Sequence, residues 1–448
     1  MFAPLKDLAA DLAAEKTSSE KLTEEALARI GDAKGEGGRT YTDVFADAAR
    51  AEAKASDALR AAGVVPSPLA GIPISVKDLF DIRGRVTMAG SVARKGEPAA
   101  DEDAPVVARL RAAGAVILGR TNMTEFAFSG LGLNPHYGTP KNPFDRETGR
   151  IPGGSSSGAA ISVTDGMAAA GIGTDTGGSV RIPSALNGLT GFKPTARRVP
   201  TDGAFPLSWA LDSIGPLARS VDCCALLDAI MAGEAPSDVT PLSVKGMRLV
   251  VPGTMVMDDM DEHVAKTFEA ALDKLSAAGA LLEEKPFEWL LEIPASNKAG
   301  GFAPTEAYAI HRELLSRKES AYDPRVATRI QGGAKMAAAD YVILSRRRVE
   351  IQAVANAATR DYDAVLMPTV PQIAPSIASL ESNEALYHTT NLLMLRNPSL
   401  GNFLDRSAVS LPCHEAGTAP VGLMVMGETM GDAKTLSVSA GIEAVLGK

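Results

Sequence analysis

Two serine sites, each embedded in glycines, are the residues of this chain best suited to chemistry. The first is the triple serine of the run 154–158, GSSSG, and the second is Ser179, which follows two glycines. A serine hydroxyl is a poor nucleophile until a neighbouring base takes its proton. Glycine lets the backbone approach a ligand closely, so that successive N–H groups can point at one developing negative charge. The pattern therefore predicts a serine-based catalyst with an oxyanion hole.

The triple serine also matches two common glycine-rich motifs, and its surroundings argue against both. A P-loop needs a lysine before its Ser or Thr, whereas Gly158 is followed by two alanines. The G-x-S-x-G nucleophile elbow of α/β-hydrolases must follow a buried strand. Here the preceding residues 145–152, DRETGRIP, are charged and end in proline. We therefore expect neither a nucleotide-binding loop nor that elbow.

Alternating helical and strand patterns surround the serine sites and must position them. The upstream patterns predict helices over 5–13, 17–30 and 41–62, a β-branched strand ending at Lys77, a helix over 103–115 and a buried strand over 116–122. The downstream patterns predict strands over 247–253 and 363–371, a helix over 261–280, and short strands from Ser407 to 427 before a closing helix. Residues 375–405 show no regular pattern. This alternation is typical of α/β proteins.

Composition places the chain among compact globular proteins and excludes several classes of function. It has 448 residues, 45% of them hydrophobic, with a net charge of −9 and no clustered basic stripe, so we expect no nucleic-acid partner. No apolar run is long enough to span a bilayer, and the N-terminus lacks the apolar core of a secretory signal, so we expect no membrane partner. Three cysteines without zinc spacing fit a reducing cytoplasm, where we place the protein.

The run from Gly153 to Pro194, together with Lys77, resembles the amidase signature family, whose members hydrolyse or transfer carboxamide groups. The resemblance rests on GGSSSG and, further on, GTDTGGSVRIPSALNGLTGFKPT. Segments such as GIPISVKD, GRTNMTEFAF, LDSIGPLARS, YDAVLMPTVP and APVGLMVMG extend it over nearly the whole chain in the family's order. It implies an α/β fold with a large mixed twisted β-sheet covered by helices on both faces. We expect one domain, 1–448, with a helical part over about 1–62 and a catalytic core over about 66–235.

The resemblance also implies a role for each residue of the serine sites. Ser179 matches the nucleophile, Ser155 the bridging serine that follows a cis peptide bond, and Lys77 the general base. Burial can lower the pKa of a lysine enough for its neutral amine to accept a proton. Without the serine sites, Lys77 and the neighbouring Asp78 would be read as a plain strand-end salt bridge. The backbone N–H groups implied for the oxyanion hole are those of Thr176, Gly177, Gly178 and Ser179.

Other residues of these motifs have supporting or substrate-binding roles in this interpretation. Gly154, Ser156, Thr174 and Asp175 are expected to order the catalytic loops. Arg181 either anchors a substrate carboxylate or carbonyl or forms a structural ion pair, and the sequence leaves both open. Candidate substrate-binding residues are Arg181, Met123 and Ser129, with further pocket walls expected from 302–308 and from the segment after Pro375. The five histidines are scattered without H-E-x-x-H, so we expect neither a metal nor another cofactor.

The expected activity is hydrolysis of a carboxamide C–N bond in a small-molecule amide through a Ser179 acyl-enzyme, with release of ammonia or an amine. The alternatives are the glutaminase subunit of a tRNA-dependent amidotransferase and a ureide hydrolase such as a carboxybiuret hydrolase. Transamidating subunits commonly read YGRVS after KPT, whereas this chain reads ARRVP over 196–200, which disfavours the first alternative. A catalytically silent scaffold should have lost a catalytic residue, and all three are present. A homodimer is possible on family grounds.

Overall fold

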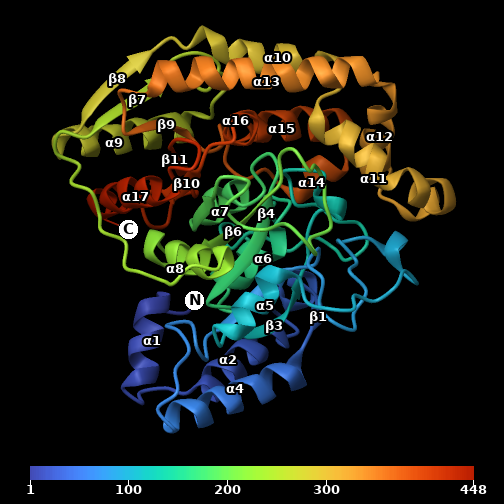
Figure 1. The fold of residues 1–448 in the computed structure, drawn as a ribbon, viewed down its shortest axis with the longest axis vertical. Helices are drawn as coiled ribbons and strands as arrows, with labels where there is room; N and C mark the ends of the chain where they lie inside the picture. The colour runs from blue at the N-terminus through green and yellow to red at the C-terminus, as the bar shows by residue number, and fades with distance from the viewer. Residues whose placement is uncertain (448) are drawn as a thin grey trace.

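The computed structural model describes residues 1–447, and their strands form one mixed 11-stranded sheet with the order β1-β3-β2-β4-β6-β5-β10-β11-β9-β7-β8 (Figure 1). The strands are β1 Tyr41–Val44, β2 Pro73–Lys77, β3 Val116–Thr121, β4 Ala170–Asp175, β5 Thr190–Lys193, β6 Ser213–Ala218, β7 Arg248–Pro252, β8 Leu281–Lys285, β9 Ala364–Pro368, β10 Ala408–Pro412 and β11 Gly422–Met426. This large mixed sheet with packed helices confirms the predicted α/β fold class.

Helices pack around the sheet along its whole length. The α-helices are α1 Leu5–Ala13, α2 Ser19–Ile30, α3 Gly37–Thr40, α4 Ala46–Ala61, α5 Pro105–Ala112, α6 Ser157–Thr164, α7 Arg181–Asn187, α8 Val221–Ala232, α9 Glu262–Ala277, α10 Glu292–Ser296, α11 Phe302–Lys318, α12 Pro324–Gly332, α13 Ala338–Thr359, α14 Ile377–Glu381, α15 Glu384–Arg396, α16 Pro398–Phe403 and α17 Asp432–Leu446. Short 3₁₀ turns lie at Val92–Arg94, Glu125–Ala127, Glu288–Leu291, Asn297–Ala299, Glu319–Ala321 and Gly333–Lys335. In Figure 1, α1, α2 and α4 lie at one end of the molecule and α10 and α13 at the other.

The strands that carry the candidate catalytic residues lie in the interior of the sheet. Strand β2 pairs in parallel with β3 on one side and β4 on the other, and all residues of the three strands are buried. A strand buried on both faces often reads as an apolar run, as at the start of β3, whereas β2 also buries the polar Ser75 and Lys77. Because β2 and β4 are parallel, their carboxyl ends meet at one edge. That edge brings Lys77 beside Thr174 and Asp175.

Two stretches of the sequence fold differently from the prediction. Residues 41–44, predicted to begin a helix, form β1, which pairs antiparallel with β3 before α4 begins at Ala46. Residues 375–405, predicted to be irregular, contain the three helices α14, α15 and α16. The buried residues of α15 are Tyr387, Thr390, Asn391 and Met394, spaced as one helical stripe. Two of these four are polar, so the stripe lacks the apolar signature by which amphipathic helices are recognised.

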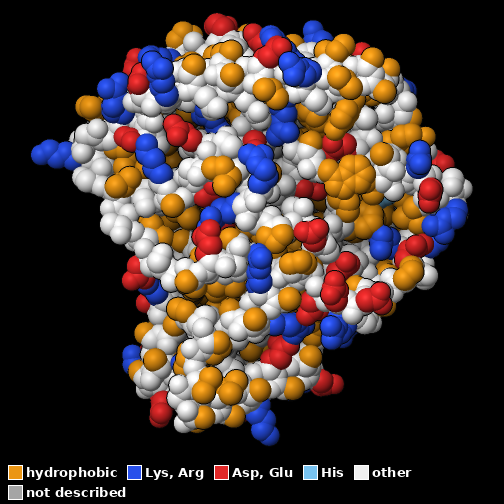
Figure 2. Space-filling view, in the orientation of Figure 1, with side chains coloured by type: hydrophobic (Ala, Val, Ile, Leu, Met, Phe, Trp, Pro, Cys, Tyr) orange, Lys and Arg blue, Asp and Glu red, His pale blue; other side chains and the backbone are white. Residues whose placement is uncertain are grey.

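The surface carries charges of both signs. Figure 2 shows lysine and arginine side chains scattered among acidic ones on the face of Figure 1, with hydrophobic side chains between them. Over residues 1–447, no helix is long and apolar enough to cross a membrane. Over the same residues, no three His, Cys, Asp or Glu side chains are grouped so that they could hold a metal ion.

Candidate active site

Lys77 ends β2 with its side chain fully buried. Its Nζ donates hydrogen bonds to Ser155 Oγ at 2.8 Å and to Thr174 Oγ1 at 2.9 Å. Burial disfavours the charged amine and lowers the pKa of Lys77 to about 7, although the negative charges of Asp212 and Asp175 act in the opposite direction. An amine with that pKa is largely neutral at mildly alkaline pH, so it can accept a proton from a serine.

Asp78 takes no part in this contact. Its carboxylate lies 3.3 Å from Arg120 Nε and accepts a hydrogen bond from the Gly90 N–H at 3.0 Å. Successive residues of a strand point to opposite faces, which places the Asp78 carboxylate away from the Lys77 amine. The structure therefore rules out the simpler reading of Lys77 and Asp78 as a strand-end salt bridge.

The triple serine and the Ser179 loop are joined through the backbone. The peptide bond between Gly154 and Ser155 is cis, and the Ser156 N–H donates to the Ser179 carbonyl oxygen at 3.3 Å. A Cβ on Gly154 would lie 2.6 Å from the backbone nitrogen of Gly132, so only glycine fits at this close approach. Ser156 Oγ also donates to the Thr174 carbonyl oxygen at 3.4 Å. The predicted supporting residues thus hold the two serine sites and the end of β4 together.

Ser179 lies just before α7 and lines a cavity of about 160 Å³. The preceding Gly178 has φ +129°, a conformation that side chains rarely adopt. Its N–H donates to Asp175 Oδ1 at 2.8 Å, which corrects the prediction that this group belongs to the oxyanion hole. The physical reason is that a buried carboxylate needs donors, and the nearest N–H supplies one. Thr176, Gly177 and Ser179 remain as the candidate donors.

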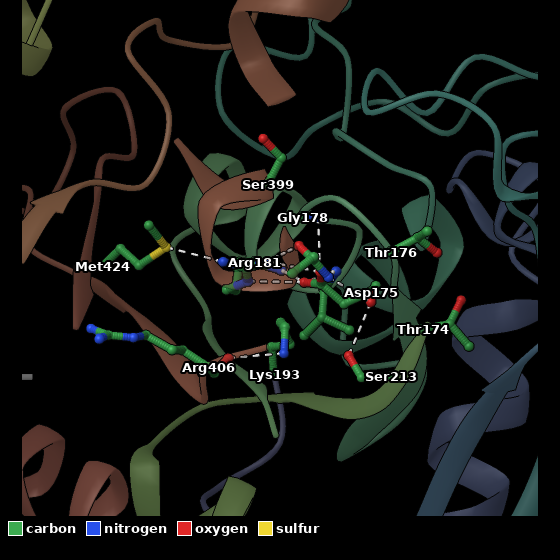
Figure 3. Close-up of polar contacts among 12 residues, drawn as sticks. Thr174, Asp175, Thr176, Gly178, Arg181, Lys193, Ser213, Ser399, Arg406 and Met424 are labelled. Carbon is green, nitrogen blue, oxygen red and sulfur yellow. Dashed lines mark hydrogen bonds and ion pairs between the residues drawn. The ribbon is translucent and has the colours of Figure 1, made fainter. Parts of the chain in front are cut away.

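A buried ion pair between Asp175 and Arg181 fixes the glycine loop, residues 176–180, which carries Ser179 (Figure 3). The Asp175 and Arg181 side chains are both fully buried, with Nη2 of Arg181 2.8 Å from Oδ1 of Asp175. Asp175 also accepts hydrogen bonds from the Val180 N–H at 3.1 Å and from Asn402 Nδ2 at 2.9 Å. The positive charge of Arg181 and these hydrogen bonds outweigh desolvation and hold the pKa of Asp175 well below its ordinary value. The sequence left two roles open for Arg181, and the structural ion pair is the one observed. Arg181 does not line the cavity, which corrects its prediction as a substrate-binding residue.

The cavity beside Ser179 is built from segments far apart in the chain. Its lining residues are Ala127, Phe128, Ser129, Thr176, Gly177, Ser179, Leu207, Leu211, Ala303, Arg329, Leu395 and Ser399. Ser129 lies at this wall, with its Oγ 2.9 Å from Asn391 Oδ1, and its role in binding substrate stays a prediction. Met123 is fully buried and is not among the lining residues, which corrects its prediction as a substrate contact. Its carbonyl oxygen accepts a hydrogen bond from Asn134 Nδ2 at 2.7 Å.

Arg329 on α12 is a cavity residue that the sequence did not indicate. Its Nη1 donates to the Phe128 carbonyl oxygen at 2.5 Å, and its guanidinium lies 4.3 Å from the centre of the Phe128 ring. Among the described residues, no carboxylate forms an ion pair with Arg329, and no acidic side chain lines the cavity. Burial lowers the pKa of the guanidinium. No local motif marks this arginine, because only the tertiary fold brings α12 to the Ser179 loop.

Comparisons with known proteins agree on one family. The Amidase family model matches residues 21–436. The chain is 36% identical to a 2-amino-5-chloromuconic acid deaminase from Comamonas testosteroni, over 89% of this chain and 87% of that protein. It is 36% identical to a 1-carboxybiuret hydrolase subunit from Pseudomonas sp. (strain ADP), over 82% and 81%. It is 33% identical to a glutamyl-tRNA(Gln) amidotransferase subunit from Roseiflexus sp. (strain RS-1), over 98% and 96%.

The fold agrees with that family as well. A crystal structure of an amidase superposes with a TM-score of 0.88 and 32% sequence identity, covering 99% of both chains. Three observations lead to one conclusion. A fully buried lysine is hydrogen-bonded to a serine beside a glycine-rich loop, a family model matches most of the chain, and the fold is shared with a known amidase. The chain belongs to the amidase family and is a hydrolase that acts on amide C–N bonds.

Proposed function

We propose that this amidase works through an acyl-enzyme on Ser179, with Lys77 as the general base and Ser155 as the proton relay. The observation that carries the proposal is the hydrogen bond from the buried Lys77 amine to Ser155, whose loop is bonded to Ser179. In the first step, Ser179 Oγ attacks the amide carbonyl while its proton passes to Ser155, whose own proton passes to neutral Lys77. The N–H groups of Thr176, Gly177 and Ser179 stabilise the oxyanion.

Collapse of this intermediate breaks the C–N bond and leaves an ester on Ser179. The leaving nitrogen takes a proton from Ser155, which regains one from Lys77, so ammonia or a neutral amine departs. Water then attacks the ester and gives its proton to the same relay, and the acid is released as Ser179 recovers its proton. Lys77 ends the cycle neutral, as it began.

The cavity favours a substrate whose acyl part carries a negative charge. Arg329 places a guanidinium there without a carboxylate of the protein to neutralise it, and arginine pairs well with carboxylates. The same cavity lacks an acidic side chain among its described lining residues, so nothing there would bind the α-ammonium of glutamine. We therefore favour an acid amide over glutamine. Two of the relatives, the 2-amino-5-chloromuconic acid deaminase and the 1-carboxybiuret hydrolase subunit, are also named for carboxylated substrates.

A ureide that bears a carboxylate is the second candidate substrate. Arg329 is the observation that favours it, because a ureide differs from an amide only in having nitrogen in place of carbon on the acyl side of the carbonyl, and it can present the same carboxylate. A panel of acid amides, neutral amides, carboxylated ureides and glutamine, scored by ammonia release, separates these candidates. Glutamine-dependent transfer to charged tRNA would instead support the transamidase alternative.

Labelling with a fluorophosphonate probe tests the nucleophile. We expect one adduct, on Ser179, and none in Ser179→Ala. Ser157→Ala is the matched control, because Ser157 belongs to the triple serine but donates only to the Asn122 carbonyl oxygen at 3.3 Å. It should keep both the label and the activity. An adduct on Ser155, or full amide hydrolysis by Ser179→Ala, would contradict the proposal.

Replacing Arg329 tests the substrate class. Arg329→Met should lower kcat/KM for an acid amide by roughly 10- to 100-fold, the usual worth of a charged hydrogen bond. The same variant should change kcat/KM little for a neutral amide of equal length, which controls for damage to the cavity. Equal losses for both substrates would refute carboxylate binding at Arg329 and leave the Ser179 chemistry untouched.

A further inference from the structure

The segment 207–212, here called the wall loop, forms one side of the catalytic cavity. Leu207 and Leu211 line the cavity directly, and the loop leads into β6 at Ser213. Its path is held by carboxylates from two directions. The inner carboxylate belongs to Asp212, the last residue of the loop, and the outer one to Glu306 on α11.

Asp212 connects the wall loop to the oxyanion-hole backbone. Its Oδ1 accepts a hydrogen bond from Thr176 Oγ1 at 2.5 Å, while Oδ2 accepts from the Leu207 N–H at 2.9 Å and the Ser208 N–H at 3.1 Å. Thr176 carries one of the candidate oxyanion donors and also lines the cavity. One side chain therefore fixes both the cavity wall and a residue whose N–H faces the reacting carbonyl in the proposed mechanism.

Glu306 holds the same loop from the outside. Its Oε2 accepts from Ser208 Oγ at 2.5 Å and from the Ala210 N–H at 3.1 Å, and its Oε1 accepts from the Tyr341 hydroxyl at 2.5 Å. Between these two anchored residues, Trp209 is 66% exposed. The indole thus extends from a loop whose neighbouring positions are fixed, and its motion reports on whether the loop stays anchored.

We propose that Asp212 is a positioning residue for amide hydrolysis, which sets the Thr176 oxyanion donor and the wall loop in one arrangement. The proposal rests on the proposed Ser179 mechanism. The charged groups that act around it are Lys77, Asp175 and Glu306. The negative charge of Asp212 raises the pKa of Lys77, and the burial of the Asp212 carboxyl raises its own pKa to about 6, with Glu306 adding to that rise.

Asp212→Asn tests the positioning role by kinetics. We expect kcat to fall by on the order of tenfold, with a smaller change in KM, because a displaced oxyanion donor weakens binding of the transition state more than of the substrate. The rising limb of kcat/KM with pH should also move to lower pH, since Lys77 loses a neighbouring negative charge. Asp212→Glu, which keeps the charge but moves the carboxylate, should lower kcat and leave that limb in place.

Asp432→Asn is the matched control. Asp432 also accepts from a threonine hydroxyl and a backbone N–H, both of Thr195 at 2.8 Å, but it lies at the start of α17 and does not line the cavity. If the loss of any such buried carboxylate only destabilised the protein, Asp212→Asn and Asp432→Asn should be affected alike. Asp432→Asn should leave kcat/KM and the position of its rise with pH unchanged. The same pH shift in both variants would overturn the proposal.

Fluorescence gives a readout that needs no substrate. The chain has two tryptophans, so Trp289→Phe leaves Trp209 as its only indole. In that background, Asp212→Asn should lower the anisotropy of Trp209 and increase its quenching by acrylamide, whereas Asp432→Asn should not. Unchanged anisotropy together with an unchanged pH limb would refute the role of Asp212. A wild-type protein that hydrolyses no amide would refute the proposed function instead, and the anisotropy would still show whether Asp212 anchors the loop.

Discussion

The pH dependence of amide hydrolysis should follow the titration of Lys77. Burial lowers the pKa of its amine from 10.5 to about 7, and only the neutral amine can accept the relayed proton. At about pH 8, a lysine with a pKa near 7 is roughly 90% neutral, whereas one with an ordinary pKa is roughly 0.3% neutral. In the proposed mechanism, burial therefore raises the fraction of enzyme with a neutral Lys77 by about 300-fold at that pH.

The assay is kcat/KM for ammonia release, measured from about pH 5.5 to about pH 10. We expect a rise with a midpoint near 7 in the wild-type enzyme. Lys77→Arg, whose guanidinium stays protonated throughout this range, should lose that limb and fall by on the order of 10³-fold in kcat/KM. Lys193→Met is the matched control, because Lys193 is also fully buried, with its pKa lowered to about 8 by burial, but donates only to the carbonyl oxygens of Pro194 and Arg406.

The control should keep the wild-type midpoint. A midpoint near 10 would mean that burial does not make Lys77 a usable base, and a Lys77→Arg enzyme with more than about a tenth of wild-type activity would mean that another group takes the proton. Loss of the rising limb in Lys193→Met would mean that the limb reports the titration of Lys193 and not of Lys77. Each of these results would refute the reasoning from burial to basicity.

Two further predictions concern stability. Because the folded-state pKa of Lys77 is lowered, the unfolded chain binds more protons between about pH 7 and pH 10.5, so stability rises with pH across that window. The thermal midpoint of Lys77→Met relative to wild type should therefore become more favourable as pH falls from 10 toward about 7, and a constant difference would contradict this. Arg181→Met should lower the free energy of unfolding in urea by about 3 to 5 kcal/mol, because it leaves the fully buried Asp175 charge unpaired. A loss below about 1 kcal/mol would mean that Asn402 and the backbone donors suffice.

The local structure around the candidate catalytic residues could be predicted from sequence because its signals are local. The apolar run before Lys77 predicts a buried strand, and β2 ends at that residue. Glycines mark the positions where the backbone needs positive φ or a close approach, as at Gly178 and Gly154. These constraints act on single residues and their neighbours, so they appear in the sequence itself.

The cavity could be predicted only in part because its walls depend on tertiary contacts. Arg329 carries no motif that distinguishes it from a surface charge, and Asp212 belongs to the segment LDSIGPLARS, which resembles the family but does not indicate what the carboxylate contacts. Their roles arise from what α12 and the residues before β6 bring beside Ser179. The sequence does not indicate helix α15 for a related reason. Asn391 lies on its buried stripe because it accepts hydrogen bonds from Ser129 and from the Gly130 N–H, so a polar residue stands where helical periodicity requires an apolar one.

Carboxylates, rather than apolar side chains, fix the loops of this site, and this choice has a chemical consequence. A loop that must present N–H groups to a substrate cannot be buried under apolar residues, but one carboxylate can satisfy several backbone donors at once. Asp175 and Asp212 do this at the glycine loop and the wall loop. Their charges also raise the pKa of Lys77, against the desolvation that lowers it. The pKa near 7 thus results from two opposing effects, since burial lowers it and the carboxylates that fix the two loops raise it; in the proposed mechanism the glycine loop carries the oxyanion donors and Lys77 is the base. A variant that loosens one of these loops by removing its carboxylate should therefore also lower the pKa of Lys77, because it removes a negative charge.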